Sequence, residues 1–178
     1  MHDNLPDENI LQSSPASCAI KCQQIILRDY GIDVSEEDLC RIAKENGWYD
    51  EKVGVYMHDN GKLLGCFGVG YTHSQHNDLQ TIRKELVLGH SIMVSVNQAK
   101  LAEKPDIHNQ ASHSVVVNAM NDTIVYITNP GSGNPNESIM IDLFITAWED
   151  SCCYMLHTCD KAIYIYDPVL KVMVERNC

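Results

Sequence analysis

Long apolar runs are missing from this chain. No stretch of its 178 residues comes near the roughly 18 to 20 consecutive apolar residues that a membrane-spanning helix needs. The polar segment 1–9 also lacks the basic-then-apolar order of a secretory signal, and we expect this segment to be flexible. These absences predict a cytoplasmic protein without a membrane span, with a secreted or injected effector as the alternative.

Basic residues are scarce as well. The sequence has 13 Lys and Arg against 24 Asp and Glu, which gives a formal net charge of −11. Its few cations are scattered, whereas binding to a phosphate backbone needs them clustered, so we expect no nucleic-acid partner. A cationic peptide would suit this charge, although surplus acid more often serves solubility.

Signatures of disulfides and of metal sites are weak, although the chain has eight cysteines. The cysteine spacings are unlike those of small secreted scaffolds, so we expect free thiols in a reducing cytosol. One group does contain zinc-binding residue types, namely Cys152, Cys153, His157 and Cys159. Its spacing matches no paired zinc knuckle, and adjacent cysteines rarely bind one ion, so we expect no metal and no cofactor.

The pattern of apolar residues predicts an α+β fold. The length suits a single domain over 1–178, and 44% of hydrophobic residues is enough for a core. Helical spacing predicts a helix-rich first half. One helix starts near Cys18, the next two are expected to be capped by Ser35 and Asn77, and the three stop at Gly31, Gly47 and Gly89. Segment 51–76 is expected to be a loop with a short helix at 62–67.

The second half is expected to form an antiparallel sheet packed against those helices. Runs of β-branched and aromatic residues predict strands at 92–96, 113–117, 123–128, 154–156 and 162–166. We expect loops at 97–111, on the substrate side, and at 131–137. Asp142 is expected to cap a short helix that carries Phe144 and Trp148.

Cys18 is the candidate nucleophile. A cysteine attacks a carbonyl as the thiolate, which a helix N-terminus and a neighbouring base both favour. The proline and apolar spacing around it predict a helix start, with Ser14 or Ser17 as the cap, so Cys18 lies in the first turn. Gln12 precedes it by six residues, and its amide with the Cys18 backbone N–H can form an oxyanion hole.

His113 is the candidate general base, and Asn129 is the candidate residue that orients it. His113 begins one β-branched strand and Asn129 ends the next, so an antiparallel hairpin makes them neighbours. The Asn129 amide can then accept the second ring N–H and fix the tautomer. Asp167 also follows a strand and is the rival for this role, but it requires a further assumption about strand order.

Each of these residues also has an ordinary interpretation. A lone cysteine such as Cys18 is more often an inert core thiol, and Gln12 alone is a solvated loop residue. His113 can be an ordinary residue at the start of a strand, and Asn129 before a proline can simply initiate a turn. The occurrence of all four together favours the catalytic interpretation.

These residues resemble those of the bacteriocin-processing cysteine peptidases, which are papain-like domains. The similarity covers roughly residues 10–170 and rests on the run Gln12 to Cys18, Tyr30-Gly31, the His113 strand, Asn129-Pro130, and Phe144 with Trp148. It implies a papain-like fold, cleavage of a leader peptide after a double glycine, and an export transporter as a candidate partner. Ala19, Ser114 and Asn129 depart from the family pattern, which usually has glycine, a bulky residue and aspartate at these positions.

The resulting hypothesis is a cysteine peptidase that acts on a peptide or protein through a Cys-His-Asn triad with a glutamine oxyanion donor. The same residues can serve an acyltransferase, in which an amine or thiol replaces water. The departures Ala19 and Ser114 leave a third interpretation open, a non-catalytic relative that binds peptides.

Overall fold

The structure is a computed structural model that describes residues 8–102, 112–159, 164–167 and 172–175. Most of segment 1–9, the end of the expected loop 97–111 and the start of the expected strand 162–166 lie outside the described residues. In the part that is described, no helix is both long and apolar enough to cross a membrane.

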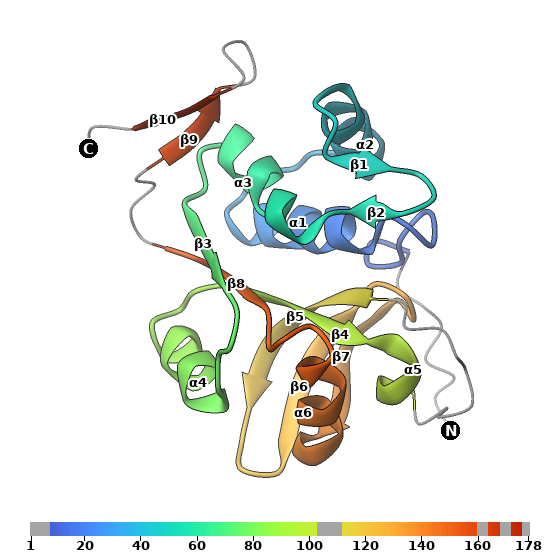
Figure 1. The fold of residues 1–178 in the computed structure, drawn as a ribbon, viewed down its shortest axis with the longest axis vertical. Coiled ribbons are helices and arrows are strands. Elements are labelled where there is room, and N and C mark those ends of the chain that lie inside the picture. Colours follow the sequence, from blue (N-terminus) through green and yellow to red (C-terminus); the bar gives the residue numbers. More distant parts are fainter. Residues whose placement is uncertain (1–7, 103–111, 160–163, 168–171, 176–178) are drawn as a thin grey trace.

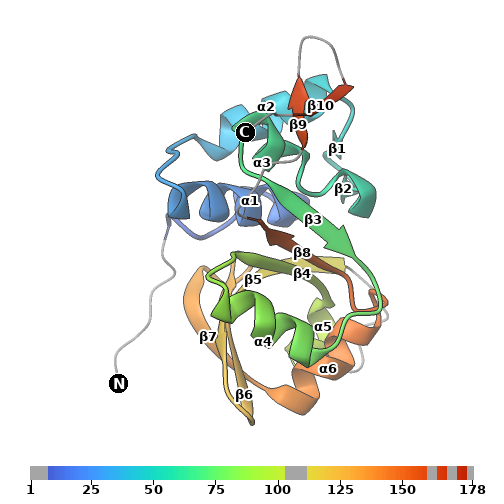
Figure 2. The same ribbon diagram turned by 90° about the vertical axis from the view of Figure 1, so that its left-hand side faces the viewer.

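Two groups of helices lie on opposite sides of a six-stranded sheet (Figures 1 and 2). The first group contains α1 (Cys18–Asp29), α2 (Glu36–Glu45) and α3 (Lys62–Cys66), which the 3-10 turn η1 (Met57–Asp59) precedes. The second group contains α4 (Leu79–Val87), α5 (Gln98–Leu101) and α6 (Ile141–Glu149). This arrangement confirms the predicted α+β class.

All neighbouring strands of the main sheet are antiparallel. Their order is β3 (Tyr71–Ser74), β8 (Met155–Thr158), β4 (Ile92–Asn97), β5 (Ser112–Met120), β6 (Ile124–Asn129) and β7 (Asn134–Met140). Two smaller antiparallel pairs are β1 (Tyr49–Asp50) with β2 (Gly54–Val55), and β9 (Tyr164–Asp167) with β10 (Val172–Glu175). The expected hairpin is therefore present as β5 and β6.

The sheet separates two hydrophobic cores. Along β4, Met93 belongs to the core beneath α1, α2 and α3, whereas Ile92 and Val94 belong to the core that also contains Phe144 and Trp148 of α6. Successive side chains of a strand point to opposite faces, so both faces of β4 are covered. This explains why all six residues of β4 are buried.

Several predicted helix boundaries are confirmed. Gly31, Gly47 and Gly89 follow the ends of α1, α2 and α4 with φ angles of 73°, 73° and 79°, a left-handed conformation that favours glycine. Ser35 Oγ accepts a 3.0 Å hydrogen bond from Asp38 N at the start of α2, as its capping sequence predicts.

The prediction that Asn77 caps a helix is wrong. Asp78 caps α4, since its Oδ1 accepts a 2.8 Å hydrogen bond from Thr81 N. The Asn77 amide instead donates to the carbonyl oxygens of Ser74 and Cys153, at 3.1 and 3.0 Å. Asn and Asp are both favoured cap residues, so the local sequence does not tell them apart. The contact of Asn77 with the distant Cys153 leaves Asp78 as the cap.

Other corrections concern strands in segments that are expected to be loops. Within 51–76 the structure has β2 and β3, and the start of β7 falls within 131–137. β2 is too short to show an alternation of apolar and polar residues. β3 and β7 are the edge strands of the main sheet, where exposed polar residues are tolerated. Asp142 lies within the first turn of α6 rather than at its cap, which is Met140.

Candidate active site

Cys18 is the first residue of α1, so its thiol lies at the positive end of the helix dipole. Ile20, Ile26 and Leu27 are fully buried and anchor the helix in the core between α1 and the sheet. Ser17 occupies the N-cap position but makes no capping bond; its hydroxyl donates to Glu36 Oε1 at 2.7 Å. The nucleophile candidate is thus placed as expected, with a different role for its neighbour.

The β5–β6 hairpin brings His113 and Asn129 together. His113 is the second residue of β5 and Asn129 the last of β6, and His113 Nε2 lies 2.8 Å from Asn129 Oδ1. The two residues are only 3% and 6% exposed. A hydrogen bond this well shielded from water holds the imidazole in a fixed orientation.

Hydrogen bonds around the Asn129 amide determine which ring nitrogen faces the thiol. Asn129 Nδ2 donates to Glu137 Oε2 at 2.8 Å, and Asn129 Oδ1 accepts from Gly131 N at 3.0 Å. The oxygen therefore faces His113, so Nε2 is the ring nitrogen that carries the proton donated to Asn129. Nδ1 is therefore the ring nitrogen left to interact with the Cys18 thiol.

Asp167, the rival for the orienting role, ends β9; among the described strands, β9 pairs with β10 and not with the main sheet. Its side chain lies outside the described residues. The geometry that is described joins His113 to Asn129.

Cys18 and His113 perturb one another. Burial of the thiol opposes ionisation, but the hydrogen bond and charge of His113, together with hydrogen bonds from Ser114, lower the pKa of Cys18 below its ordinary value. Burial likewise opposes protonation of the ring, but Cys18 and Asn129 raise the pKa of His113 above its ordinary value. Opposite shifts of this kind favour a thiolate–imidazolium pair.

Gln12 lies beside this group. Its backbone N–H donates to the carbonyl oxygen of Pro130 at 3.0 Å, which attaches the segment before α1 to the residue after Asn129. Its side-chain Nε2 donates to the carbonyl oxygen of Ser14 at 2.6 Å. Among the described residues, Gln12 Oε1 is buried without a hydrogen-bond partner. The structure thus brings all four predicted site residues into one region.

Glu36 is a site residue that the sequence does not reveal. Its carboxylate accepts hydrogen bonds from the backbone N–H and hydroxyl of Ser13, at 3.0 and 2.8 Å, and from the hydroxyl of Ser17 at 2.7 Å. The Lys21 ammonium lies 3.2 Å from it. Burial opposes its ionisation, yet the bonds from Ser17 and Ser13 and the charge of Lys21 lower the pKa of Glu36. This carboxylate therefore holds the turn that carries the nucleophile.

No local signal in the sequence points to this role. Glu36 is one of three acids in the first turn of α2, and the helix dipole alone accounts for acids there. It is 23 residues from Ser13 along the chain, a contact that no periodicity predicts.

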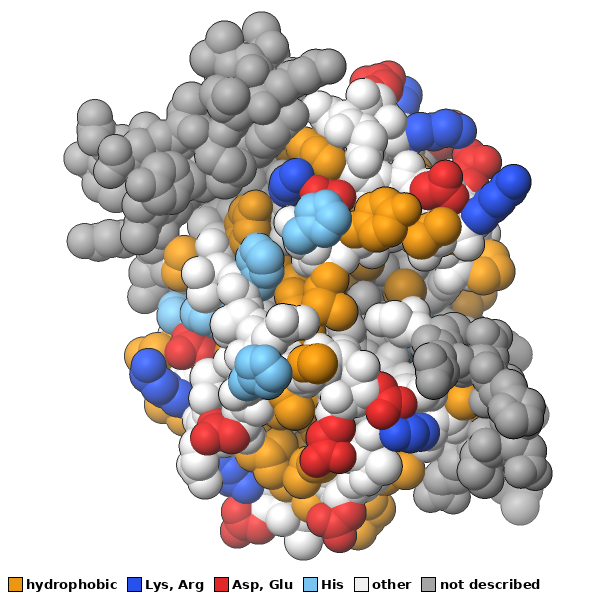
Figure 3. Space-filling model, in the orientation of Figure 1, with side chains coloured by type: hydrophobic (Ala, Val, Ile, Leu, Met, Phe, Trp, Pro, Cys, Tyr) orange, Lys and Arg blue, Asp and Glu red, His pale blue; other side chains and the backbone are white. Residues whose placement is uncertain are grey.

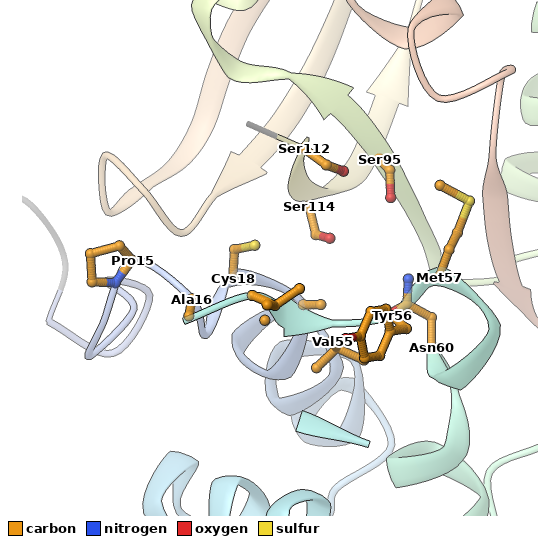
Figure 4. A pocket seen from close by; sticks show the side chains of 13 residues that line it. Pro15, Ala16, Cys18, Val55, Tyr56, Met57, Asn60, Ser95, Ser112 and Ser114 are labelled. Carbon is orange, nitrogen blue, oxygen red and sulfur yellow. The ribbon is translucent and has the colours of Figure 1, made fainter. Parts of the chain in front are cut away.

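A pocket of about 240 Å³ opens beside Cys18 (Figure 4). One side is polar and comes from β4 and β5, with Ser95, Ser112 and Ser114; the other is largely apolar and includes Val55, Tyr56 and Met57. In Figure 3, hydrophobic side chains also gather in the middle of the face shown, between the first helix group and the sheet. Ser114 contributes only a small side chain to the pocket wall next to the thiol.

No protein-family model matches the sequence, and no curated protein does. Solved structures nevertheless share the fold. A putative C39-like peptidase from Bacillus anthracis is 15% identical, with a TM-score of 0.69 over 89% of this chain and 96% of its own. The peptidase domain of Streptococcus ComA, a bi-functional ABC transporter involved in a quorum-sensing pathway, is 12% identical, with a TM-score of 0.64 over 85% and 97%.

A third similar structure is a double glycine motif protease from an AMS/PCAT transporter, in complex with its leader peptide. It is 13% identical, with a TM-score of 0.56 over 84% of this chain and 89% of its own. Identities this low establish the fold and leave the activity open. The chain therefore has the α+β fold of the C39-like, papain-like peptidases, which confirms at the level of fold the resemblance apparent in its sequence.

Proposed function

We propose that this protein is a cysteine peptidase of the C39-like type. The observation that carries the proposal is the continuous chain of contacts from the Cys18 thiol through the His113 ring to the Asn129 amide. Acyl transfer needs a nucleophile, a base beside it and a group that orients the base, and these contacts support those roles for the three residues.

The proposed reaction begins with transfer of the Cys18 proton to His113 Nδ1. The thiolate attacks the carbonyl carbon of a peptide bond, and the carbonyl oxygen becomes an oxyanion that the Cys18 backbone N–H and the Gln12 amide stabilise. His113 then donates its proton to the leaving amine as the C–N bond breaks. Water, activated by the same ring, hydrolyses the thioester and releases the acyl product.

For the substrate we propose a peptide cut after a small residue such as glycine, in a leader or another peptide. The fold supports this, since two of the similar structures are a transporter's peptidase domain and a double glycine motif protease with its leader peptide. A cytoplasmic location and an export transporter as partner belong to the same proposal. Single-domain organisation over 1–178 is likewise proposed.

The most direct test is incubation with a peptide that ends in a glycine-based electrophile, followed by mass mapping of the modified residue. The proposal expects one adduct per chain, on Cys18, and none in Cys18→Ala. Cleavage of double-glycine peptides then separates hydrolysis from transfer, because added amines or thiols would appear in the product of an acyltransferase. A Cys18 that reacts no faster than the other thiols would support the non-catalytic, peptide-binding interpretation instead.

A further inference from the structure

Glu85, His90 and His157 converge at a place well away from Cys18. Glu85 lies in the last turn of α4, His90 lies just after that helix, and His157 lies on β8. Glu85 Oε2 is 2.7 Å from His90 Nδ1 and 3.3 Å from His157 Nδ1. The three side chains are 7%, 10% and 15% exposed, so the cluster is largely shielded from solvent.

The shape of the cluster suits a small cation. One ligand atom from each residue lies within 4.8 Å of the corresponding atoms of the other two. Ligand atoms around a tetrahedral zinc ion, with bonds of about 2.1 Å, are about 3.4 Å apart, so adjustments of about an ångström would seat the ion. The two imidazole rings are stacked, with centroids 5.7 Å apart and planes 16° apart, so they approach the carboxylate side by side.

The backbone holds these residues in place. His90 N donates to the carbonyl oxygen of Glu85 at 3.1 Å, which closes the end of α4. His157 pairs with Ile92 on one side and Thr72 on the other, in the interior of the sheet. The Lys84 ammonium lies 3.7 Å from Glu85 Oε1, whereas Oε2 faces both rings. His157 Nδ1 also donates to the carbonyl oxygen of Thr158 at 2.9 Å, a hydrogen bond that a bound ion would replace.

We propose that Glu85, His90 and His157 bind a zinc ion. Two imidazole nitrogens and one carboxylate are ligands that zinc accepts readily, whereas magnesium and calcium prefer oxygen ligands alone. Water supplies the fourth ligand. His157 belongs to the group of zinc-binding residue types in segment 152–159, but its partners here are Glu85 and His90 rather than the neighbouring cysteines.

The position of the site implies a structural role. His157 pairs with Ile92 at one end of β4, and His113 pairs with Val96 near the other end. Ile92 and Val96 are four steps apart along the strand, which is about 13 Å. A zinc ion here would fasten the end of α4 to β8 without touching the peptide-cleaving group. This inference is therefore independent of the proposed function.

Cobalt(II) provides the test, since its visible absorption reports tetrahedral nitrogen and oxygen ligands and its near-ultraviolet charge-transfer band reports thiolates. The protein should be titrated with Co²⁺ alone, in a Cys18→Ser background so that the thiol next to His113 cannot compete. We expect one equivalent to bind with visible bands and no thiolate band, and Zn²⁺ to displace it. Zn²⁺ should also raise the midpoint of thermal unfolding.

His90→Gln and His157→Gln should each weaken Co²⁺ binding by roughly 100-fold or more, since loss of a direct ligand costs at least as much as loss of a residue behind one. His73→Gln changes an exposed histidine on the neighbouring strand β3 and should leave binding unchanged. Circular dichroism of the metal-free variants checks that they are folded. Absence of binding in the folded parent protein, binding that survives both substitutions, or a spectrum dominated by thiolate would each overturn the proposal.

Discussion

Glu137 accepts a 2.8 Å hydrogen bond from Asn129 Nδ2, and this bond determines how the amide faces His113. Because the nitrogen is held by Glu137, the oxygen is the atom that meets the ring, and the ring proton is fixed on Nε2. Ser132 Oγ donates to the same carboxylate oxygen at 3.0 Å. An edge strand, β7, thus supplies a residue that sets the tautomer of the proposed general base.

Replacement of Glu137 by alanine should lower kcat/KM by roughly tenfold or more, since a hydrogen bond to a charged group is worth about 1.5–3 kcal/mol. The charge of Glu137 is among the causes that raise the pKa of His113. Its removal should therefore move the alkaline limb of the pH–rate profile to lower pH. Asn136→Ala, at an exposed neighbouring position, is the control and should change neither quantity.

Thiol reactivity should distinguish Cys18 from the other cysteines. Its lowered pKa predicts rapid alkylation by iodoacetamide at mildly acidic pH, whereas burial raises the pKa of Cys40 and of Cys66 to about 11 and raises that of Cys22 well above its ordinary value. Mass mapping over time gives the rate at each site. Cys18→Ala should abolish turnover without unfolding the protein, and uniform slow labelling of all eight cysteines would contradict the assignment.

Replacement of Glu36 by alanine should destabilise the protein by about 3 kcal/mol, because it leaves the Lys21 charge buried without its partner. Chemical denaturation measures this loss. Glu37→Ala removes an exposed acid from the same helical turn and should cost less than about 0.5 kcal/mol. Equal losses of stability in the two variants would show that the buried contacts of Glu36 stabilise the protein no more than an exposed acid does.

Glu36 also predicts a pH dependence of stability. Its folded pKa is lowered, so its contribution is fully present above the unfolded pKa, near about 4.3, and disappears as the pH falls through the folded value. Glu36→Gln should therefore flatten the acid side of the stability profile. It should also slow the alkylation of Cys18, since Ser17 loses the charged acceptor that fixes the turn.

Gln12→Ala tests the oxyanion donor separately from the nucleophile. Loss of one such donor should lower kcat by roughly 100- to 1,000-fold. Alkylation by iodoacetamide forms no oxyanion, so the labelling rate of Cys18 should stay within about twofold of the parent. A variant with unchanged kcat would remove Gln12 from the mechanism.

The sequence predicts those parts of the site that depend on local structure. The start of α1 at Cys18 follows from its turn and apolar spacing, and the meeting of His113 with Asn129 follows from hairpin geometry. Contacts between distant segments have no such signal. Glu36 with Ser13, and His157 with Glu85, depend on how the helices dock on the sheet. The polar edge strand β7 escapes prediction because only one of its sides pairs with another strand.

The two halves of the Cys18–His113 pair belong to different layers of the fold. Cys18 belongs to α1 and His113 to the sheet, and apolar side chains such as Val116 and Met93 join that face of the sheet to the helical core. A small sliding of α1 over β5 would separate thiol from imidazole while leaving every helix and strand intact. The rate of Cys18 alkylation therefore reports the position of α1 relative to β5. It should change before circular dichroism detects any loss of structure.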